Sequence, residues 1–442
     1  MFDGATIDQL ARQLKEPAWV TDIRRKALAK HQQLPWPHPS DDVWRRTDVS
    51  LLDPSRGFVL AGPALLQAIP LNNPVVARSI QPLGNEQLAV RLNGAWLEEP
   101  RLRGVDISEL AQAARQHPQV VRPFFESNGL TAAEEKLTSL NTAFHHDDVW
   151  IHVPRDVAVE QPLRVVHVLS ASARQALFPL TLITVGAGSR VTLIDEYLSV
   201  PAPRMHGGGA GDPPESGEPH LINSRIELVI EPNASVHYVR LQRLAPTARE
   251  FLFQRAVLAS GATLTMANLY LGGLLSKTHI VTKFVGEQAS SKLYGFVFGH
   301  HDQHVDQHTV QDHQAAHTAS DLQVKAALQD QSRMIYTGLI RIAKEAKQTN
   351  AYQANHNLML SKDAQAETIP MLEILADDVQ CKHGASVGPI DEEQTFYLMS
   401  RGIARSIAER LVVMGFVEPI VQQVPFEPLQ EQLRREIEGN LH

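Results

Sequence analysis

Gly188-Ser-Arg-Val-Thr-Leu193 is followed along the chain by three segments of similar design. Each begins with a turn-forming or polar residue, continues with a small residue, and then alternates between the two faces of a short strand. The later segments start 45, 28 and 27 residues after the preceding one; they are Asn233-Ala-Ser-Val-His-Tyr238, Gly261-Ala-Thr-Leu-Thr-Met266 and Gln288-Ala-Ser-Ser-Lys-Leu293. A turn and a short strand that recur at this spacing predict a β-solenoid, whose coils stack into one core.

The first interval is longer because a segment rich in glycine and proline, Val200 to His220, interrupts it. We expect 200–220 to be a flexible insertion. Without it, the period is in the twenties throughout. A β-sandwich with chance similarity between its strands is the alternative interpretation.

The repeat lies within a longer region of strand-like sequence, 149–389. Short alternating runs follow one another there without helical stretches of about 10–15 residues between them, which argues against a doubly wound α/β fold. Residues 1–148 and 390–442 instead contain apolar positions at helical spacing, and Asp391-Glu-Glu-Gln394 has the acidic pattern of a helix start. We therefore predict a mainly β protein: a helical region and lead-in (1–148), a β-helix (149–389) and C-terminal helices (390–442).

Composition excludes several classes of protein. The chain has 442 residues, of which 43% are hydrophobic and 20% charged, with a net charge of −8. That charge argues against nucleic-acid binding through a basic surface. No apolar run approaches the roughly 18–20 residues of a membrane span. A single cysteine and no secretory signal predict a reducing, cytoplasmic setting.

That cysteine stands in the segment Asp377-Asp-Val-Gln-Cys-Lys-His-Gly384. On a strand, Cys381 and His383 point to the same side. A thiolate beside an imidazole suits iron, copper or zinc, but a closed site needs about four ligands. If the pair binds metal, another protein supplies the remaining ligands. The alternative is a buried thiol next to a structural histidine.

A second candidate metal site is the histidine-rich segment 300–317, which contains six histidines. His300, His304 and His308 alternate with Asp302 and Asp306, so on a strand they share one face. Imidazole and carboxylate ligands suit iron or zinc. The alternative is a solvated outer strand face.

The segment Asp377 to Ile403 resembles the signature of the SufB/SufD family of iron–sulfur cluster assembly proteins. Four other segments are similar to family segments: Pro39 to Asp48, Leu140 to Phe144, Gln348 to Gln353, and Asn355 to Leu360. The form C-K-H-G-A-S-V-G at Cys381 is similar to the SufD branch rather than the SufB branch.

The resemblance implies a right-handed parallel β-helix with helical regions at both ends. It implies a scaffold subunit that is not an enzyme, in a complex with SufB and the ATPase SufC, where ATP hydrolysis belongs to SufC. SufB pairs with this chain β-helix to β-helix, a nascent iron–sulfur cluster is shared with SufB, and reduced FAD is bound in the complex. A homodimer is the expected alternative when SufB is absent.

The resemblance also assigns roles by position. His383 falls on a cluster ligand at the SufB interface, and Cys381 falls on a nearby cysteine. The SufC-docking residues are Asp391, Glu392, Glu393, Gln394, Phe396, Tyr397 and Arg401. Two functions from other classes remain as alternatives: a β-helix carbohydrate-active enzyme using Asp302 and Asp306, and a metal-binding protein using the histidine-rich segment.

Overall fold

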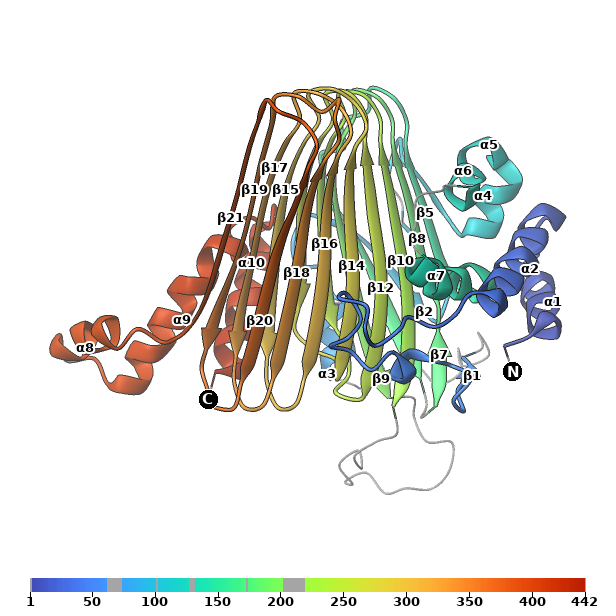
Figure 1. Cartoon of the computed structure of the whole chain (residues 1–442). Helices are drawn as coiled ribbons and strands as arrows, with labels where there is room; N and C mark the ends of the chain where they lie inside the picture. Colours follow the sequence, from blue (N-terminus) through green and yellow to red (C-terminus); the bar gives the residue numbers. More distant parts are fainter. Residues whose placement is uncertain are drawn as a thin grey trace, which may run out of the picture.

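The computed structural model describes residues 2–61, 74–100, 102–126, 132–171, 174–201 and 219–441. Most of the insertion predicted at 200–220 therefore lies outside the described residues. The protein is mainly β, with 44% strand and 25% helix, and its strands form a β-solenoid of about seven turns with helices at both ends (Figure 1). The predicted fold class is confirmed.

The helices are α1 (Gly4–Gln13), α2 (Ala18–Gln33), the 3₁₀ helix η1 (Val49–Leu52), α3 (Pro74–Ser79), α4 (Leu110–Gln116), α5 (Pro118–Val121), α6 (Pro123–Glu126), α7 (Ala132–Phe144), α8 (Glu392–Ser400), α9 (Arg405–Val421) and α10 (Glu427–Asn440). The strands before the main repeat are β1 (Val59–Leu60), β2 (Gln87–Leu92), β3 (Ala95–Glu98) and β4 (Asp106–Ser108). The strands of the repeat are β5 (Asp147–Val153), β6 (Leu163–Ala171), β7 (Gln175–Leu177), β8 (Pro179–Val185), β9 (Arg190–Pro201), β10 (His220–Ile230), β11 (Ser235–Arg243), β12 (Ala248–Leu258), β13 (Thr263–Tyr270), β14 (Leu275–Phe284), β15 (Ser290–Gly299), β16 (His304–His313), β17 (Ala319–Leu328), β18 (Arg333–Ile342), β19 (Thr349–Met359), β20 (Gln365–Ile374) and β21 (Val379–Pro389).

Two long sheets form the walls of the solenoid. Sheet A has the order β20-β18-β16-β14-β12-β10-β8-β5-β4, and sheet B has the order β21-β19-β17-β15-β13-β11-β9-β6-β2-β3. The chain alternates between the sheets, so each strand pairs in parallel with the strand one coil earlier. Antiparallel pairs occur in the described chain where β3 meets β2 and where β4 meets β5, at the N-terminal end of the solenoid.

The strand register gives the true period. Paired residues lie 26 positions apart where Arg249 meets Leu275, and 32 apart where Arg333 meets Gln365. Across the insertion, Arg190 pairs with Ser235, 45 positions later. The period in the twenties predicted from the sequence therefore holds for the middle coils, and the later coils are slightly longer.

The turn residues that began each repeat form one corner of the solenoid. Their backbones are left-handed, with φ of 71° at Gly188, 58° at Asn233, 66° at Gly261 and 62° at Gln288. Each donates its N–H to a carbonyl of the next coil; the acceptors of these four are Pro232, Ser260, Glu287 and Ala316, at 3.0, 2.9, 2.9 and 3.3 Å. Asp156, His317 and Gln348 continue the same column. Glycine and asparagine adopt this conformation at little cost, which is why they mark the repeat.

The interior between the sheets is apolar but contains a buried charged group. His167 places Nε2 3.0 Å from Asp195 and Nδ1 3.5 Å from Asp147, with all three side chains largely or fully buried. Although burial alone lowers it, these carboxylates raise the pKa of His167 to about 9. The hydroxyl of Tyr238 also donates to Asp195 at 2.7 Å. The buried charges are thus paired with charges of opposite sign, as a stable core requires.

Helices and a strap cover the outer faces of the two sheets (Figure 1). On sheet B, α9 and α10 contribute Val417, Ile420 and Leu433 to a cluster with Phe296 and Phe298 of β15. On sheet A, α7 and the residues just after α2 pack over β12, β14 and β16. No helix among the described residues is long and apolar enough to cross a membrane.

The strap, residues 34–58, runs across the coils of sheet A. Trp44 stacks on Phe251 of β12, with ring centroids 6.1 Å apart. Lys277 of β14 lies 2.9 Å from Asp306 of β16 and donates to the carbonyl of Val43. Two further strap contacts complete the crossing: Thr47 donates to Asp306, and Arg46 pairs with Glu367 of β20 at 2.6 Å.

Two features differ from the sequence prediction. Strand β12 was not predicted, because Phe251 and Phe253 on its outer face are buried as fully as Leu252 on its inner face. A strand buried on both faces lacks the alternation by which strands are recognised. The helical spacing of Ile107, Leu110 and Ala111 predicts a helix capped by Ser108, but Ile107 and Ser108 belong to β4. The helix begins only at Leu110, after the N-cap Glu109.

The left-handed corner yields a stability prediction. Gln288→Val should lower the free energy of unfolding by roughly 1–2 kcal/mol, because a β-branched residue resists positive φ. Gln288→Asn is the matched control and should change stability little, since asparagine tolerates this conformation. Urea and thermal unfolding of both variants would measure the difference; equal stability would contradict the role of the corner.

Candidate functional site

The last turn of the solenoid carries Cys381 and His383 on β21. Within the described chain, β21 pairs with β19 and β20 pairs with β18, and each has its second edge unpaired. Both sheets therefore end in an open strand edge at the same end of the solenoid (Figure 1). Such edges are ready to pair with another chain.

Both candidate side chains face the space between the sheets. The register aligns Cys381 with Ala351 and His383 with Gln353. Gln353 points toward sheet A, where its amide donates to the carbonyl of Gly338 at 3.1 Å. Paired residues of parallel strands point the same way, so the pair lies on the inner face of the last coil.

The two residues differ in burial. Cys381 is half-buried and packs on a cluster that includes Ile340 and Ile342, whereas His383 is exposed. Burial raises the pKa of the Cys381 thiol. Since the thiolate is the form that binds metal, the cysteine of the isolated chain is less ready to act as a ligand than the histidine.

The surroundings of the pair are apolar and exposed. Leu375 after β20 is 62% exposed and Val387 of β21 is 47% exposed, and Leu372 and Ile374 are also uncovered. Solenoids normally end in a polar cap. Here α8, α9 and α10 lie beside sheet B, and the inner face of the last coil stays open (Figure 1). The exposed apolar group marks an interaction surface.

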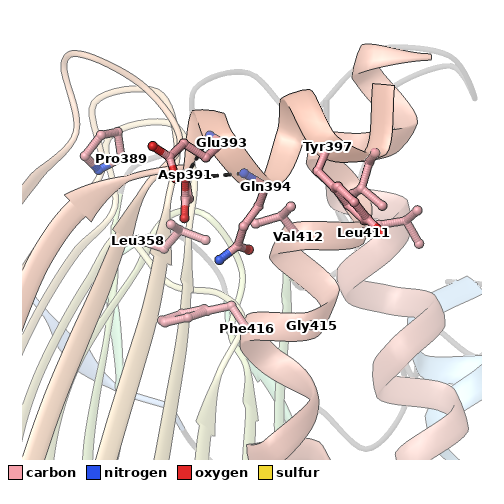
Figure 2. A pocket seen from close by; sticks show the side chains of 11 residues that line it. Leu358, Pro389, Asp391, Glu393, Gln394, Tyr397, Leu411, Val412, Gly415 and Phe416 are labelled. Atoms are coloured by element: carbon pink, nitrogen blue, oxygen red, sulfur yellow. Dashed lines mark hydrogen bonds between the residues drawn. The ribbon is translucent and has the colours of Figure 1, made fainter. Parts of the chain in front are cut away.

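A second feature lies beside this end, where β21 passes into the C-terminal helices. Asp391 caps α8, and its Oδ1 accepts from the backbone N–H of Glu393 at 2.9 Å and of Gln394 at 3.4 Å. Helices α8 and α9 meet at an angle around Gly402, which has φ of 87°. Between the helices and the sheet is a hollow of about 980 Å³ (Figure 2).

The expected docking residues are divided between the hollow and the outside of α8. Asp391, Glu393, Gln394 and Tyr397 line the hollow. Phe396, at 71% exposure, and Glu392 are exposed, and Glu392 pairs with Arg405 at 2.7 Å. Arg401 also lies outside the lining and packs over the ring of Tyr397 at 5.1 Å. The structure thus gathers all seven residues at one helix, but in two environments.

Part of this hollow is formed by residues that were not predicted as docking residues from the sequence. Its lining also includes Leu358 of β19, Pro389 of β21, Leu398 of α8, and Leu411, Val412, Gly415 and Phe416 of α9 (Figure 2). The helical spacing of Ile407, Leu411 and Met414 was the available signal. Leu411 and Ile407 are both about half exposed, at 48% and 53%, which is unusual for apolar residues on a packed helix.

The predicted histidine row is not a joint metal site. His304 and His308 share one face of β16, as predicted, but residues four apart on a strand are separated by roughly 13 Å. His300 precedes the strand. Burial lowers the pKa of His304 to about 4 and that of His308 well below its usual value. The described residues contain no group of three or more side chains suited to one metal ion.

Asp302 and Asp306, the two carboxylates considered for a carbohydrate-active enzyme, have different environments. Asp306 is buried and lies 2.9 Å from Lys277, so its carboxylate is held in a structural ion pair. Asp302 lies outside the strand in an exposed turn. A glycosidase needs two carboxyl groups facing one substrate, and this arrangement does not provide them.

Comparison with known proteins gives a consistent result over nearly the whole chain. The family profile described as "SUF system FeS cluster assembly, SufBD core domain" matches residues 167–416, and "SufBD protein N-terminal region" matches 8–165. The chain is 28% identical over 459 aligned residues to "Iron-sulfur cluster assembly protein SufD" of Bacillus subtilis, covering 99% of this chain and 97% of the relative. It is 24% identical to an "Iron-sulfur cluster assembly SufBD family protein" of Staphylococcus epidermidis, covering 98% and 93%.

The burial of Cys381 yields a prediction about its reactivity. At pH 7.5, iodoacetamide should alkylate the folded chain more slowly than the same chain unfolded in urea, because the raised pKa leaves less thiolate. The alkylation rate of the folded chain should rise as the pH is raised above 7.5, because more of the thiol is then deprotonated. The chain has one cysteine, so mass spectrometry reports this site alone; a folded rate equal to the unfolded rate would contradict the prediction.

Proposed function

The chain belongs to the SufBD family of iron–sulfur cluster assembly proteins, and we propose that within it the chain is a SufD-type scaffold subunit. In this proposal it pairs with SufB and with the ATPase SufC. It binds part of a nascent cluster, which is the cargo, and is not itself an enzyme. The observation that supports this most strongly is the open last coil, where the Cys381–His383 pair lies among exposed apolar residues.

The pairing with SufB is supported by what the last coil lacks. Two sheets end there in unpaired edges, beside Leu372, Ile374 and Val387, which are exposed. A second β-helix stacked on this end would bury these side chains and satisfy the edges. It would also bring its own ligands next to His383, which has too few ligand neighbours to hold a cluster by itself.

The chemistry of the pair suits a cluster that must later be released. Imidazole binds iron less tightly than thiolate does and titrates near neutral pH. When ligands are shared across an interface, opening the interface removes the partner's ligands at once. Cys381 is a secondary ligand in this proposal, because burial disfavours its thiolate unless a metal or a partner charge offsets that effect.

The SufC-docking role is supported by the hollow beside α8. It combines an apolar floor of Leu358, Leu411 and Phe416 with an acidic rim that includes Asp391 and Glu393. Such a combination fits a partner that inserts apolar side chains and surrounds them with basic groups. We extend the docking set from the seven residues of α8 and its flanks to Ile407 and Leu411 of α9. ATP hydrolysis belongs to the partner.

Three further expectations stay predictions. The complex binds reduced FAD, for which we assign no residue of this chain. The protein is cytoplasmic. In the absence of SufB, two copies pair through their open ends as a homodimer.

The ligand assignment can be tested by anaerobic reconstitution of the complex with SufB and SufC. His383→Ala should lower the iron and sulfide retained per complex by roughly tenfold or more, and Cys381→Ala should lower it less. Lys382→Ala is the matched control, because that side chain lies between the two and points to the other face. Normal cluster content in the His383 variant would remove the ligand role.

The two interaction surfaces can be separated by a reciprocal pair of variants. Leu411→Glu should weaken SufC binding by at least about 2 kcal/mol, or roughly thirtyfold, since it places a charge in an apolar contact. It should leave SufB binding unchanged. Leu375→Glu on the last coil should do the reverse. Pull-down and calorimetric titration would measure both, and loss of SufC binding in the Leu375 variant alone would refute the docking assignment.

A further inference from the structure

Two imidazoles meet on the outer face of sheet A, away from the last coil and from the hollow beside α8. His279 of β14 and His308 of β16 are directly paired in the strand register. Their ring centroids are 4.3 Å apart with an angle of 73° between the ring planes. Their Nδ1 atoms face each other at 3.4 Å.

A carboxylate lies beside the first imidazole. Oε1 of Glu134, on α7, lies 2.7 Å from Nε2 of His279, and both side chains are largely buried. The carboxylate is therefore next to one ring nitrogen of His279, and the other ring nitrogen, Nδ1, faces His308. Metal-bound histidines are held in this way, with the second ring nitrogen on a carboxylate.

One ring nitrogen of the second imidazole has no hydrogen-bond partner among the described residues. His308 is 6% exposed, and its Nε2 is buried without a hydrogen-bond partner. The contact with His279 involves only Nδ1 of His308, so the second ring nitrogen of this buried side chain is left without a partner.

The pair lines a groove with room for water. The groove has a volume of about 510 Å³, with a wall formed by Asp41, Val43 and Trp44 of the strap. Lys283 and Arg341 flank it, but Lys283 lies beside Asp312 in the register and Arg341 pairs with Glu373 at 3.0 Å. The nearby positive charges are thus offset by carboxylates.

We propose that His279 and His308 bind one first-row divalent metal ion through their Nδ1 atoms, with Glu134 supporting His279 from behind. With metal–nitrogen bonds of about 2.0–2.1 Å, two ligands of a tetrahedral ion lie roughly 3.3–3.4 Å apart, which matches the separation in the structure. Imidazole is a good ligand for zinc, cobalt, nickel, copper and iron. On binding, the ring hydrogen of His308 is carried on Nε2, so that Nδ1 is available to the metal.

Two protein ligands define the character of the site. Groove water would complete the coordination shell, so the ion is exchangeable and held more weakly than in a closed site. The predicted row on β16 contributed one of the two ligands. The other ligand, His279, lies on the neighbouring strand β14, and its position next to His308 follows from the strand register.

The test uses the full-length chain with Cys381→Ser and His383→Ala, which removes the other soft-ligand pair. Titration with Co²⁺, followed by its visible absorption, and competition with Zn²⁺ by calorimetry should give one saturable equivalent. His279→Gln and His308→Gln should each weaken binding at least tenfold. His304→Gln is the matched control on the same face of β16 and should bind as the parent does, while Glu134→Gln should weaken binding by an intermediate amount.

X-ray absorption on the cobalt-loaded parent gives a reading that does not depend on how the variants fold. Two imidazole ligands per ion support the proposal. Fewer than two imidazoles, no saturable equivalent, or equal binding by the parent and a folded His279→Gln, His308→Gln double variant would each overturn it. All of these results are independent of cluster assembly, because the end-coil ligands are absent from the protein tested.

Discussion

The structure depends on one backbone hydrogen bond, repeated at one corner of each coil that precedes the last. A residue with positive φ turns the chain from sheet A into sheet B and donates its N–H to the coil that follows. This bond fixes how each coil sits on the next. Because strand pairing is in register, the choice of which side chains face inward passes from coil to coil. The register set by the preceding coils therefore determines that Cys381 and His383 face inward.

The column of corner residues also explains why the solenoid could be predicted. Gly188, Asn233 and Gly261 are types that adopt positive φ readily, so the sequence itself marks the turns. His317 and Gln348 adopt the same conformation without such a signature, and they were not recognised as part of the repeat. Where the stacked coils impose positive φ at the corner, any residue that tolerates this conformation can occupy the position. The repeat is then no longer marked by glycine or asparagine in the sequence.

In the candidate sites, too, some contacts can be predicted from the spacing of residues along the sequence, whereas others depend on how the strands pair. Cys381 and His383 could be paired from their spacing, since residues two apart on a strand share a face. Their exposure at an open end could not, because it depends on where the solenoid stops and which way the C-terminal helices leave it. The proximity of His279 and His308, 29 positions apart, follows only from strand pairing. Strand β12 was missed because helices and the strap bury its outer face, a tertiary effect that local alternation cannot contain.

The strap has a mechanical consequence. A solenoid whose last strands are paired on one side only can be peeled apart one coil at a time, because each coil is held chiefly by the coil before it. The strap runs across the coils and is fastened at β12, β14, β16 and β20 through Trp44, Lys277, Asp306 and Glu367. A force applied to the last coil is therefore distributed to the earlier coils that contain β12, β14 and β16. The strap therefore makes the coils that it crosses resist separation together rather than one at a time.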